Sequence, residues 1–261
     1  MVALITGAST GIGAEFARQF AARGHDLVVV ARSEDKLNAL AQQLRAAHGV
    51  NITVIAMDLS IPTAAGDLWQ RTNSLGLEIT VLVNNAGVGT HCDVADARPE
   101  RLEEEVRLNC LTLIGTTSRY LPQMRARGGG TIINISSTAA FLPLPKMAVY
   151  GATKSFVLSF TEALWSEERK HGVRVLAVCP GLTDTAFFEV AGEAAVKAAS
   201  GTAASRFTRT PQQVVDATMH ALSGRKPSFV DGAANAVVWR GFTKVLPRRL
   251  MIALSGWLIE G

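Results

Sequence analysis

Tyr150 and Lys154 are the residues whose types and spacing could most directly do chemistry, because they lie four positions apart where a helical segment begins. Both side chains then project from one face of that helix. A free tyrosine has a pKa of about 10, too high for efficient proton exchange near neutral pH, and a nearby ammonium group lowers that pKa by favouring the phenolate. The pair could therefore act as a general acid and base. The same spacing also fits an ordinary helical pair with a solvated lysine.

A glycine-rich turn, Thr6-Gly-Ala-Ser-Thr-Gly-Ile-Gly13, follows a short apolar strand and opens a helix. Gly7 permits a tight exit from the strand, Gly11 lets the backbone approach a pyrophosphate, and Gly13 allows the helix to pack closely on the strand. The N-terminus of the helix attracts phosphate charge. The glycine order is GxxxGxG, and a plain tight turn is the alternative. The position between strand and helix favours a dinucleotide site.

The residues that follow the second predicted strand indicate which dinucleotide binds. About twenty residues beyond Gly13, an acidic residue would bind the ribose 2′-hydroxyl of NAD. Arg32 and Ser33 stand there instead, and they offer a guanidinium and a hydroxyl to the 2′-phosphate of NADP. The alternative is a solvated arginine, with Ser33 capping the next helix. We expect NADP(H) to be preferred over NAD(H).

The elements that position these residues follow from the alternation of short apolar runs with longer segments of helical period, the pattern of repeated βαβ units. The predicted fold is α/β, a Rossmann-type doubly wound parallel sheet of about seven strands with helices on both faces, in one domain over residues 1–261. We expect strands near Val2–Thr6, Asp26–Ala31, Ile52–Ala56, Thr80–Asn84, Thr131–Ser136, Val173–Cys179 and Ser228–Val230. We expect helices near Gly11–Arg23, Glu34–Ala47, Ala64–Leu75, Pro99–Arg127, Ala148–His171 and Pro211–Ser223.

Composition excludes several classes of protein. The 261 residues are 48% hydrophobic and 18% charged, enough apolar material for one large core. The widely spaced Cys92, Cys110 and Cys179 predict reduced thiols, and the scattered histidines predict no metal centre. The chain runs from Met1 almost directly into an apolar strand without a basic leader, which predicts a cytoplasmic protein. The basic balance comes with no recognition motif, so we expect no nucleic-acid partner.

Together these motifs resemble the short-chain dehydrogenase/reductase family, in its single-domain branch of about 250 residues. The resemblance spans nearly the whole chain. It implies an NADP(H)-dependent oxidoreductase that interconverts a ketone or aldehyde and its alcohol by hydride transfer, as a homodimer or homotetramer formed through the fourth and fifth long helices. It rests on the glycine-rich turn and, in family order, on Asn84-Asn85-Ala86-Gly87, Asn109, Ser137, Tyr150-Gly-Ala-Thr-Lys154, and Pro180-Gly181 with Thr183.

The resemblance also implies catalytic roles. Tyr150 would give its proton to the carbonyl oxygen in reduction and take it back in oxidation. Ser137 would hydrogen-bond the substrate oxygen, and Lys154 would hold the nicotinamide ribose hydroxyls. Asn109 would anchor a water in a proton relay from Lys154 to solvent. Alternatively, Asn109 would only fill the polar gap that a kink opens in a helix.

The cofactor contacts implied by the resemblance extend along the strand ends. Asp58 and Leu59 would meet the adenine, and Asn85, Ala86 and Gly87 would pass along the adenosine ribose. Pro180, Gly181 and Thr183 would cradle the nicotinamide. The expected contacts in the first turn and after the second strand are Gly7, Ser9, Thr10, Gly11, Ile12, Gly13, Arg32 and Ser33.

Apolar segments on both sides of the site predict a lipophilic substrate. We expect a pocket formed by Ser137, Phe141, Leu142, Phe187 and Phe188, with residues 192–201 as a movable lid. These side chains could equally be core or subunit contacts. A β-ketoacyl or steroid reductase is the second interpretation, and a non-catalytic NADP-sensing regulator is the third.

The end of the chain, residues 233–261, is a basic amphipathic tail of the same domain. Val238, Phe242 and Val245 share one helical face. Arg240, Lys244 and Arg248 share another, and Pro247 breaks the segment. Residues 236–259 could make peripheral contact with an anionic membrane. Packing against the body or a sister subunit is the preferred alternative.

Overall fold

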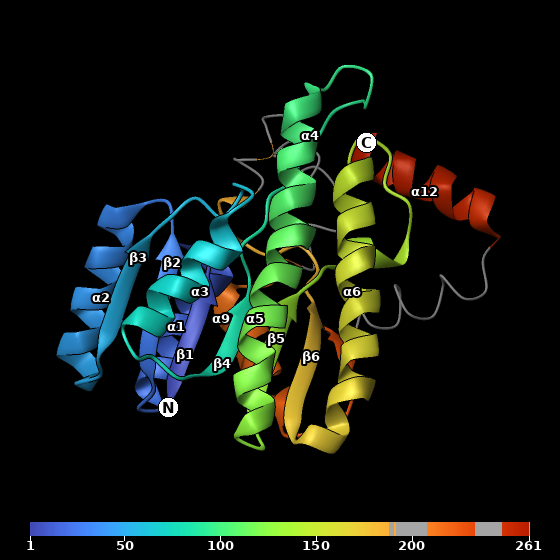
Figure 1. Cartoon of the computed structure of the whole chain (residues 1–261). Coiled ribbons are helices and arrows are strands. Elements are labelled where there is room, and N and C mark those ends of the chain that lie inside the picture. Colours follow the sequence, from blue (N-terminus) through green and yellow to red (C-terminus); the bar gives the residue numbers. More distant parts are fainter. Residues whose placement is uncertain (188–190, 192–207, 233–246, 261) are drawn as a thin grey trace.

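The computed structural model describes residues 1–187, 191, 208–232 and 247–260, and in these ranges it shows one parallel sheet between two layers of helices (Figure 1). The strand order is β3-β2-β1-β4-β5-β6-β7, and each neighbouring pair is parallel. The predicted doubly wound Rossmann-type fold is therefore confirmed. The strands are β1 Val2–Thr6, β2 Asp26–Ala31, β3 Ile52–Ala56, β4 Ile79–Asn84, β5 Gly130–Ile135, β6 Val173–Cys179 and β7 Ser228–Val230.

The helices bury one face each against the sheet, because their apolar residues recur with helical period. They are α1 Gly11–Ala22, α2 Glu34–His48, α3 Ala64–Ser74, α4 Pro99–Val106, α5 Leu113–Ala126, α6 Ala148–Glu168, α9 Pro211–Leu222 and α12 Arg248–Glu260. Short 3-10 turns, η2 Thr138–Phe141 and η3 Arg169–His171, flank α6.

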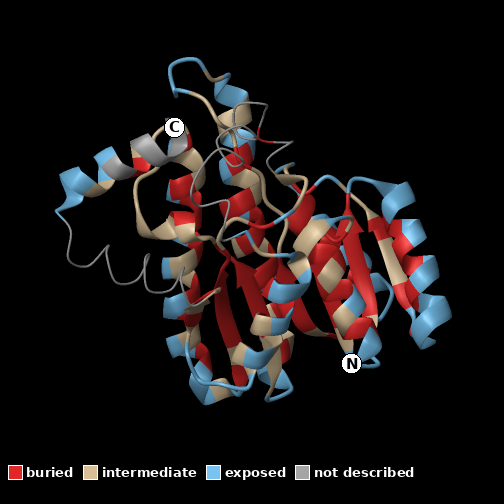
Figure 2. Cartoon of the chain, turned by 180° about the vertical axis from the view of Figure 1, so that it is seen from behind, coloured by how far each residue is buried: buried red, intermediate tan, exposed pale blue. Residues whose placement is uncertain are grey.

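Two hydrophobic cores lie on opposite faces of the sheet, and Figure 2 shows the buried strands between helices with exposed outer faces. One core packs α1, α2 and α9 against the sheet, and the other packs α3, α5 and α6. Alternate residues of β1 serve both cores, since Ala3 and Ile5 belong to the first and Leu4 to the second. This double burial explains why the strands are almost continuously apolar.

One predicted helix differs from the structure. The segment expected as a single helix over Pro99–Arg127 is interrupted by a π-helical stretch, η1 Arg107–Thr112, so that α4 and α5 are separate. Asn109 lies inside this stretch and is almost completely buried. Such π segments widen a helix locally and are frequent at functional sites.

A buried polar network joins the central strands to the helices behind them. Asn84 of β4 donates to Asn134 of β5 at 2.9 Å and to Thr117 of α5 at 3.1 Å. Asn134 in turn donates to Thr161 of α6 at 3.0 Å. Because these amides bond to each other and to α5 and α6, which pack on the same face of the sheet, the register of β4 against β5 is set by side chains as well as by the ladder.

The tail contacts the body of the protein in its described part. Of the segment 236–259 that was predicted to contact a membrane, residues 236–246 lie outside the described residues. The described part begins at Pro247, and α12 follows directly. The Ser255 hydroxyl donates to the Pro143 carbonyl at 2.7 Å, so α12 is joined to the loop that precedes α6. Among the described helices, none combines the length and the hydrophobicity that crossing a membrane requires.

The parallel order brings the carboxyl ends of all the strands to one edge. The strand order reverses beside β1, whose neighbours β2 and β4 continue in opposite directions. In open parallel sheets, ligands bind in the crevice at such a switch point. The fold therefore places the loops after β1 and β4 beside this crevice.

Candidate active site

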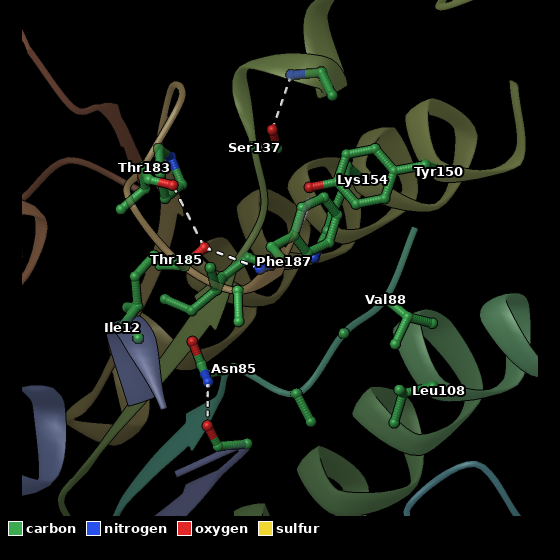
Figure 3. A pocket seen from close by; sticks show the side chains of 18 of the residues that line it. Ile12, Asn85, Val88, Leu108, Ser137, Tyr150, Lys154, Thr183, Thr185 and Phe187 are labelled. Atoms are coloured by element: carbon green, nitrogen blue, oxygen red, sulfur yellow. Dashed lines mark hydrogen bonds between the residues drawn. The ribbon is translucent and has the colours of Figure 1, made fainter. Parts of the chain in front are cut away.

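A cavity of about 460 Å³ lies at this edge of the sheet (Figure 3). Loops from β1 to β6 and the start of α6 line it, so residues far apart in the sequence meet there. Most residues predicted for the site from the sequence are in this lining: Gly7, Ser9, Thr10, Gly11, Ile12, Arg32, Ser33, Asp58, Leu59, Asn85, Ala86, Gly87, Ser137, Leu142, Tyr150, Lys154, Pro180, Gly181, Thr183 and Phe187.

Four predicted residues stand apart from that lining. Gly13 and Asn109 are not in it, although both contact residues that are. Phe141 ends the 3-10 turn η2 and does not line the cavity. Phe188 lies outside the described residues.

The structure adds lining residues that the sequence reasoning missed. Leu144 and Met147 line the cavity from the apolar run before Tyr150, so hydropathy could have indicated them. Residues from α4 and α12 had no such signal, because only the tertiary fold brings them near: Arg101, Glu104 and Ser255.

The glycine-rich turn is shaped for close backbone approach. Gly7 and Gly11 have φ values of 67° and 57°, in the left-handed region that favours glycine. A Cβ on Gly13 would lie 2.2 Å from the Gly7 carbonyl oxygen, so α1 packs directly on the turn. Thr10 is the N-cap of α1 and makes no side-chain capping bond. The first turn of α1 thus presents backbone N–H groups to the cavity.

The Thr6 hydroxyl and the Asn85 side-chain amide hold the loop after β4 against the end of β1. Thr6 Oγ1 accepts hydrogen bonds from the backbone N–H of Asn85 at 2.9 Å and of Ala86 at 3.0 Å. The Asn85 amide donates to the Thr6 carbonyl at 2.9 Å. These bonds fix the stretch after β4 beside the glycine-rich turn.

Charged groups collect at the far end of the cavity. Asp58 Oδ1 accepts from the Ser60 backbone at 2.9 Å and from its hydroxyl at 2.7 Å. Burial alone would raise the pKa of Asp58, but these bonds and the charge of Arg32 outweigh it and lower the pKa. Arg32 itself is exposed, with its side chain at the cavity.

At the other end, Tyr150, Ser137 and Lys154 converge (Figure 3). The Lys154 ammonium donates to the Ile135 carbonyl at 2.9 Å and lies 5.6 Å from the centre of the Tyr150 ring. Ser137 Oγ accepts from the Ala139 N–H at 3.1 Å, which orients the hydroxyl. The Phe187 ring packs beside Tyr150, with ring centres 5.2 Å apart.

Burial shifts the proton affinities of this pair. It raises the pKa of Tyr150 to about 12, although contact with the Ser137 hydroxyl acts in the opposite direction. It also lowers the pKa of Lys154 to about 8. The sequence predicted a lowered pKa for Tyr150, whereas in this structure the pKa is raised, because desolvation of the phenolate is the largest effect on it. Near neutral pH, the Tyr150 phenol holds its proton.

Asn109 connects the loop after β4 to α6. Its amide accepts from the Val88 N–H at 3.0 Å, and donates to the Val88 carbonyl at 2.9 Å and to Thr153 Oγ1 at 3.0 Å. A Cβ on Gly87 would meet Asn109 Oδ1 at 3.1 Å and Lys154 Nζ at 3.3 Å, so these groups crowd one point. The π-helical stretch lets Asn109 reach both segments at once.

Comparison with known proteins identifies the fold family. A family model described as short chain dehydrogenase matches residues 1–195. This chain belongs to that family. It is thereby an oxidoreductase, and the resemblance read from the motifs is confirmed.

Relatives of this short-chain dehydrogenase cover almost its whole length. The very-long-chain 3-oxoacyl-CoA reductase of Mus musculus is 32% identical over 264 residues, which cover 95% of this chain and 81% of that protein. A solved 7β-hydroxysteroid dehydrogenase has a TM-score of 0.87 at 28% identity and covers 97% of this chain and 96% of its own. A short-chain dehydrogenase from Sphingobium yanoikuyae in complex with NADPH has a TM-score of 0.81 at 32% identity, over 95% and 96% of the two chains.

Gly13→Ala in this short-chain dehydrogenase should lower the free energy of unfolding by about 1–3 kcal/mol, because the added methyl group would collide with backbone that cannot move aside. Urea unfolding measures the change. Gly66→Ala is the matched control, since it also lies in a helix but its Cβ would have ordinary contact at 3.6 Å with Arg119. That control should be neutral or slightly stabilising. Equal stability of the two variants would contradict the packing argument.

Proposed function

We propose that this short-chain dehydrogenase uses NADP(H) to interconvert a lipophilic ketone or aldehyde and its alcohol, with Tyr150 as general acid and base. The observation that carries the proposal is the convergence of Tyr150, Ser137 and Lys154 at one end of a cavity whose other end is the glycine-rich turn. One cavity can thus hold a dinucleotide and a substrate together.

The glycine-rich turn fits a dinucleotide. A Cβ on Gly7 or Gly11 would meet neighbouring atoms within 3 Å, and both positions need positive φ, so the cradle exists only with glycine there. The uncapped N-terminus of α1 would hold the pyrophosphate, and Asp58 and Arg32 would flank the adenosine. When bound, the nicotinamide supplies or accepts the hydride.

The protein's own groups would move the proton. In reduction, the Tyr150 phenol would donate to the carbonyl oxygen, while the Ser137 hydroxyl hydrogen-bonds the same oxygen as negative charge develops. Lys154 would bind ribose hydroxyls, and Asn109 would hold a relay water in addition to its observed bonds. Since the Tyr150 phenol is protonated near neutral pH, reduction should be favoured there, and alcohol oxidation should accelerate as pH rises.

Preference for NADP(H) is supported by the residues after β2. Arg32 is exposed at the cavity, and Ser33, at the N-cap of α2, makes no side-chain capping bond, so its hydroxyl is available to a phosphate. The Sphingobium relative was solved with NADPH.

A lipophilic substrate is supported by the apolar lining next to Tyr150. Leu142, Leu144, Met147 and Phe187 face the cavity there. The names of the mouse reductase and of the hydroxysteroid dehydrogenase favour a β-ketoacyl or a steroid substrate as the specific cases. Turnover with a panel of both classes would choose between them.

Assembly into a homodimer or homotetramer is supported by apolar side chains exposed on adjoining helices. Val106 of α4 is 39% exposed, Leu111 of η1 54% and Phe156 of α6 37%.

Peripheral membrane contact by the tail stays a prediction. Liposome flotation of the full chain, compared with a chain that ends at Gly232, would test it, and equal recovery of the two would exclude it.

Leu111→Glu should shift the protein toward monomer, because a charge would be buried at the proposed interface. Light scattering at several concentrations measures the mass. Leu75→Glu, an equally exposed leucine at the end of α3, is the control and should keep the parent's mass. A parent that is already monomeric would refute the assembly.

Tyr150→Phe should reduce turnover by about 10²–10⁴-fold while NADPH still binds, because only the exchangeable proton is lost. NADPH oxidation across ketones, β-ketoacyl thioesters and steroids measures turnover, and NADPH fluorescence measures binding. Tyr120→Phe is the matched control, since Tyr120 is buried in the core against Thr72. Near-normal turnover of Tyr150→Phe would refute the mechanism; NADPH binding with no turnover by the parent would favour the sensing regulator.

Arg32→Asp should cut the preference for NADPH over NADH by about 10²-fold, since a charge-assisted bond to the 2′-phosphate is replaced by repulsion. The ratio of dissociation constants for the two cofactors is the measurement. Arg71→Asp, on the exposed side of α3, should leave the ratio unchanged. Equal affinity of the parent for both cofactors would contradict the assignment.

A further inference from the structure

An ion pair that the proposed chemistry does not use lies beside the segment that follows β6. Arg209 donates two hydrogen bonds to the Asp231 carboxylate, from Nε to Oδ2 at 3.0 Å and from Nη2 to Oδ1 at 3.2 Å. The Asp231 side chain is 0% exposed, and that of Arg209 is 31% exposed. Removing a carboxylate from water is costly, so a pair of this kind calls for a physical reason.

Both partners are attached to rigid elements. Asp231 follows β7 directly, and its backbone N–H donates to the Cys179 carbonyl at 3.1 Å, so it extends the ladder between β6 and β7. Arg209 stands directly before Thr210, the N-cap of α9. Thr210 and Gln213 form a capping box there, with bonds of 3.2 Å and 3.0 Å. The ion pair therefore joins the start of a fixed helix to the end of the sheet.

The stretch 180–185 lies between these two anchors. The backbone of Arg209 bonds to it twice, because the Arg209 N–H donates to the Leu182 carbonyl at 2.9 Å and the Asp184 N–H donates to the Arg209 carbonyl at 2.9 Å. The residue directly before the stretch accepts the bond from the Asp231 backbone. The stretch is thus held from one end by Asp231 and from the other by Arg209, and the ion pair connects the two anchors.

This stretch forms one wall of the cavity (Figure 3). A Cβ on Gly11 would lie 2.9 Å from Thr185 Cγ2, so the end of the stretch lies directly against the glycine-rich turn. Its position therefore sets the width of the cavity beside that turn. Five of its residues are in the cavity lining: Pro180, Gly181, Leu182, Thr183 and Thr185.

We propose that Asp231 and Arg209 are positioning residues for the nicotinamide end of the cofactor. Neither residue lines the cavity, so both act through the backbone of 180–185, which they hold where the nicotinamide ring would lie. The inference rests on the proposed function, which supplies the identity of that ring. A wall that is fixed before the cofactor binds reduces the entropy lost when the ring is ordered for hydride transfer.

The decisive test compares two ligands of the full chain, NADPH and 2′-phospho-ADP-ribose, which is the same cofactor without its nicotinamide ring. Isothermal titration calorimetry measures both dissociation constants. Asp231→Asn keeps the shape of the side chain and removes its charge. It should raise the dissociation constant of NADPH about tenfold, the size of one lost charge-assisted hydrogen bond, and change that of 2′-phospho-ADP-ribose by less than about twofold.

The outcomes of this comparison are distinct. Equal losses for both ligands in Asp231→Asn would indicate a general disturbance of the site and overturn the proposal. An unchanged dissociation constant of NADPH in the folded variant would overturn it as well, and so would a parent in which the nicotinamide ring adds no affinity. A parent that binds neither ligand would instead refute the proposed function.

A second measurement needs no ligand, so it decides whether the ion pair holds the stretch even if the proposed function fails. Hydrogen exchange followed by mass spectrometry reports on peptides that cover residues 180–187. The Asp184 N–H in these peptides is bonded to Arg209, so Asp231→Asn should speed exchange there, by up to about tenfold. Unchanged exchange would show that the ion pair does not hold the stretch and would overturn the proposal.

Glu168→Gln is the matched control. Glu168 is also 0% exposed and also accepts two hydrogen bonds from an arginine, Arg125, but neither residue lines the cavity. Loss of this pair should lower the free energy of unfolding and leave both dissociation constants and the exchange of residues 180–187 unchanged.

Arg209→Lys replaces Asp231→Asn if that variant does not fold. It keeps a positive charge opposite the buried carboxylate and loses the bidentate geometry. The dissociation constant of NADPH should then rise about threefold, half of the free-energy change expected for Asp231→Asn, with that of 2′-phospho-ADP-ribose again unchanged. The same dissociation constant for NADPH as in the parent, or equal losses for both ligands, would overturn the proposal.

Discussion

The burial of one ammonium group, that of Lys154, is the constraint on which the site depends. Its Nζ is held by the Ile135 carbonyl at the end of β5, and its own carbonyl accepts from Ser136 at 2.8 Å. A buried cation costs free energy unless polar groups compensate its charge, and the Ile135 carbonyl does so here. The lowered pKa of Lys154 and the raised pKa of Tyr150 are two consequences of the same dry environment.

Side-chain amides, as well as backbone ladders, join the elements around this group. Asn109 binds the loop after β4 and the Thr153 hydroxyl, and the interruption of the helix between α4 and α5 is what allows it to reach both. Deeper in the protein, the side-chain amides of Asn84 and Asn134 likewise join β4, β5 and α6 by hydrogen bonds. Amides suit this use because each can donate and accept at once, so that neighbouring layers are held at a fixed distance.

The cavity has two ends of different character, and the difference matches two kinds of ligand. The end near β1 and β2 is formed by backbone, glycine and exposed charge, which suits a phosphate-bearing nucleotide. The end near α6 carries the apolar side chains of Leu142, Leu144, Met147 and Phe187 beside the proton-handling groups, and α12 adds Ser255 to its wall. A substrate bound there would contact these apolar side chains along its carbon skeleton and the hydrogen-bonding groups at its oxygen.

The alternation of strands and helices, the glycine-rich turn and the Tyr150–Lys154 pair could be predicted from the sequence, because they depend on local periodicity and on short spacings along one chain. Other features depend on contacts between segments that are distant in sequence. The π-helical break at Asn109 depends on bonds to Val88 and Thr153, which are distant in sequence, and the same holds for the contact of Ser255 with the loop before α6. The sequence also did not predict the proton affinity of Tyr150, since burial raises its pKa by more than the Ser137 hydroxyl lowers it, and burial is a property of the whole fold.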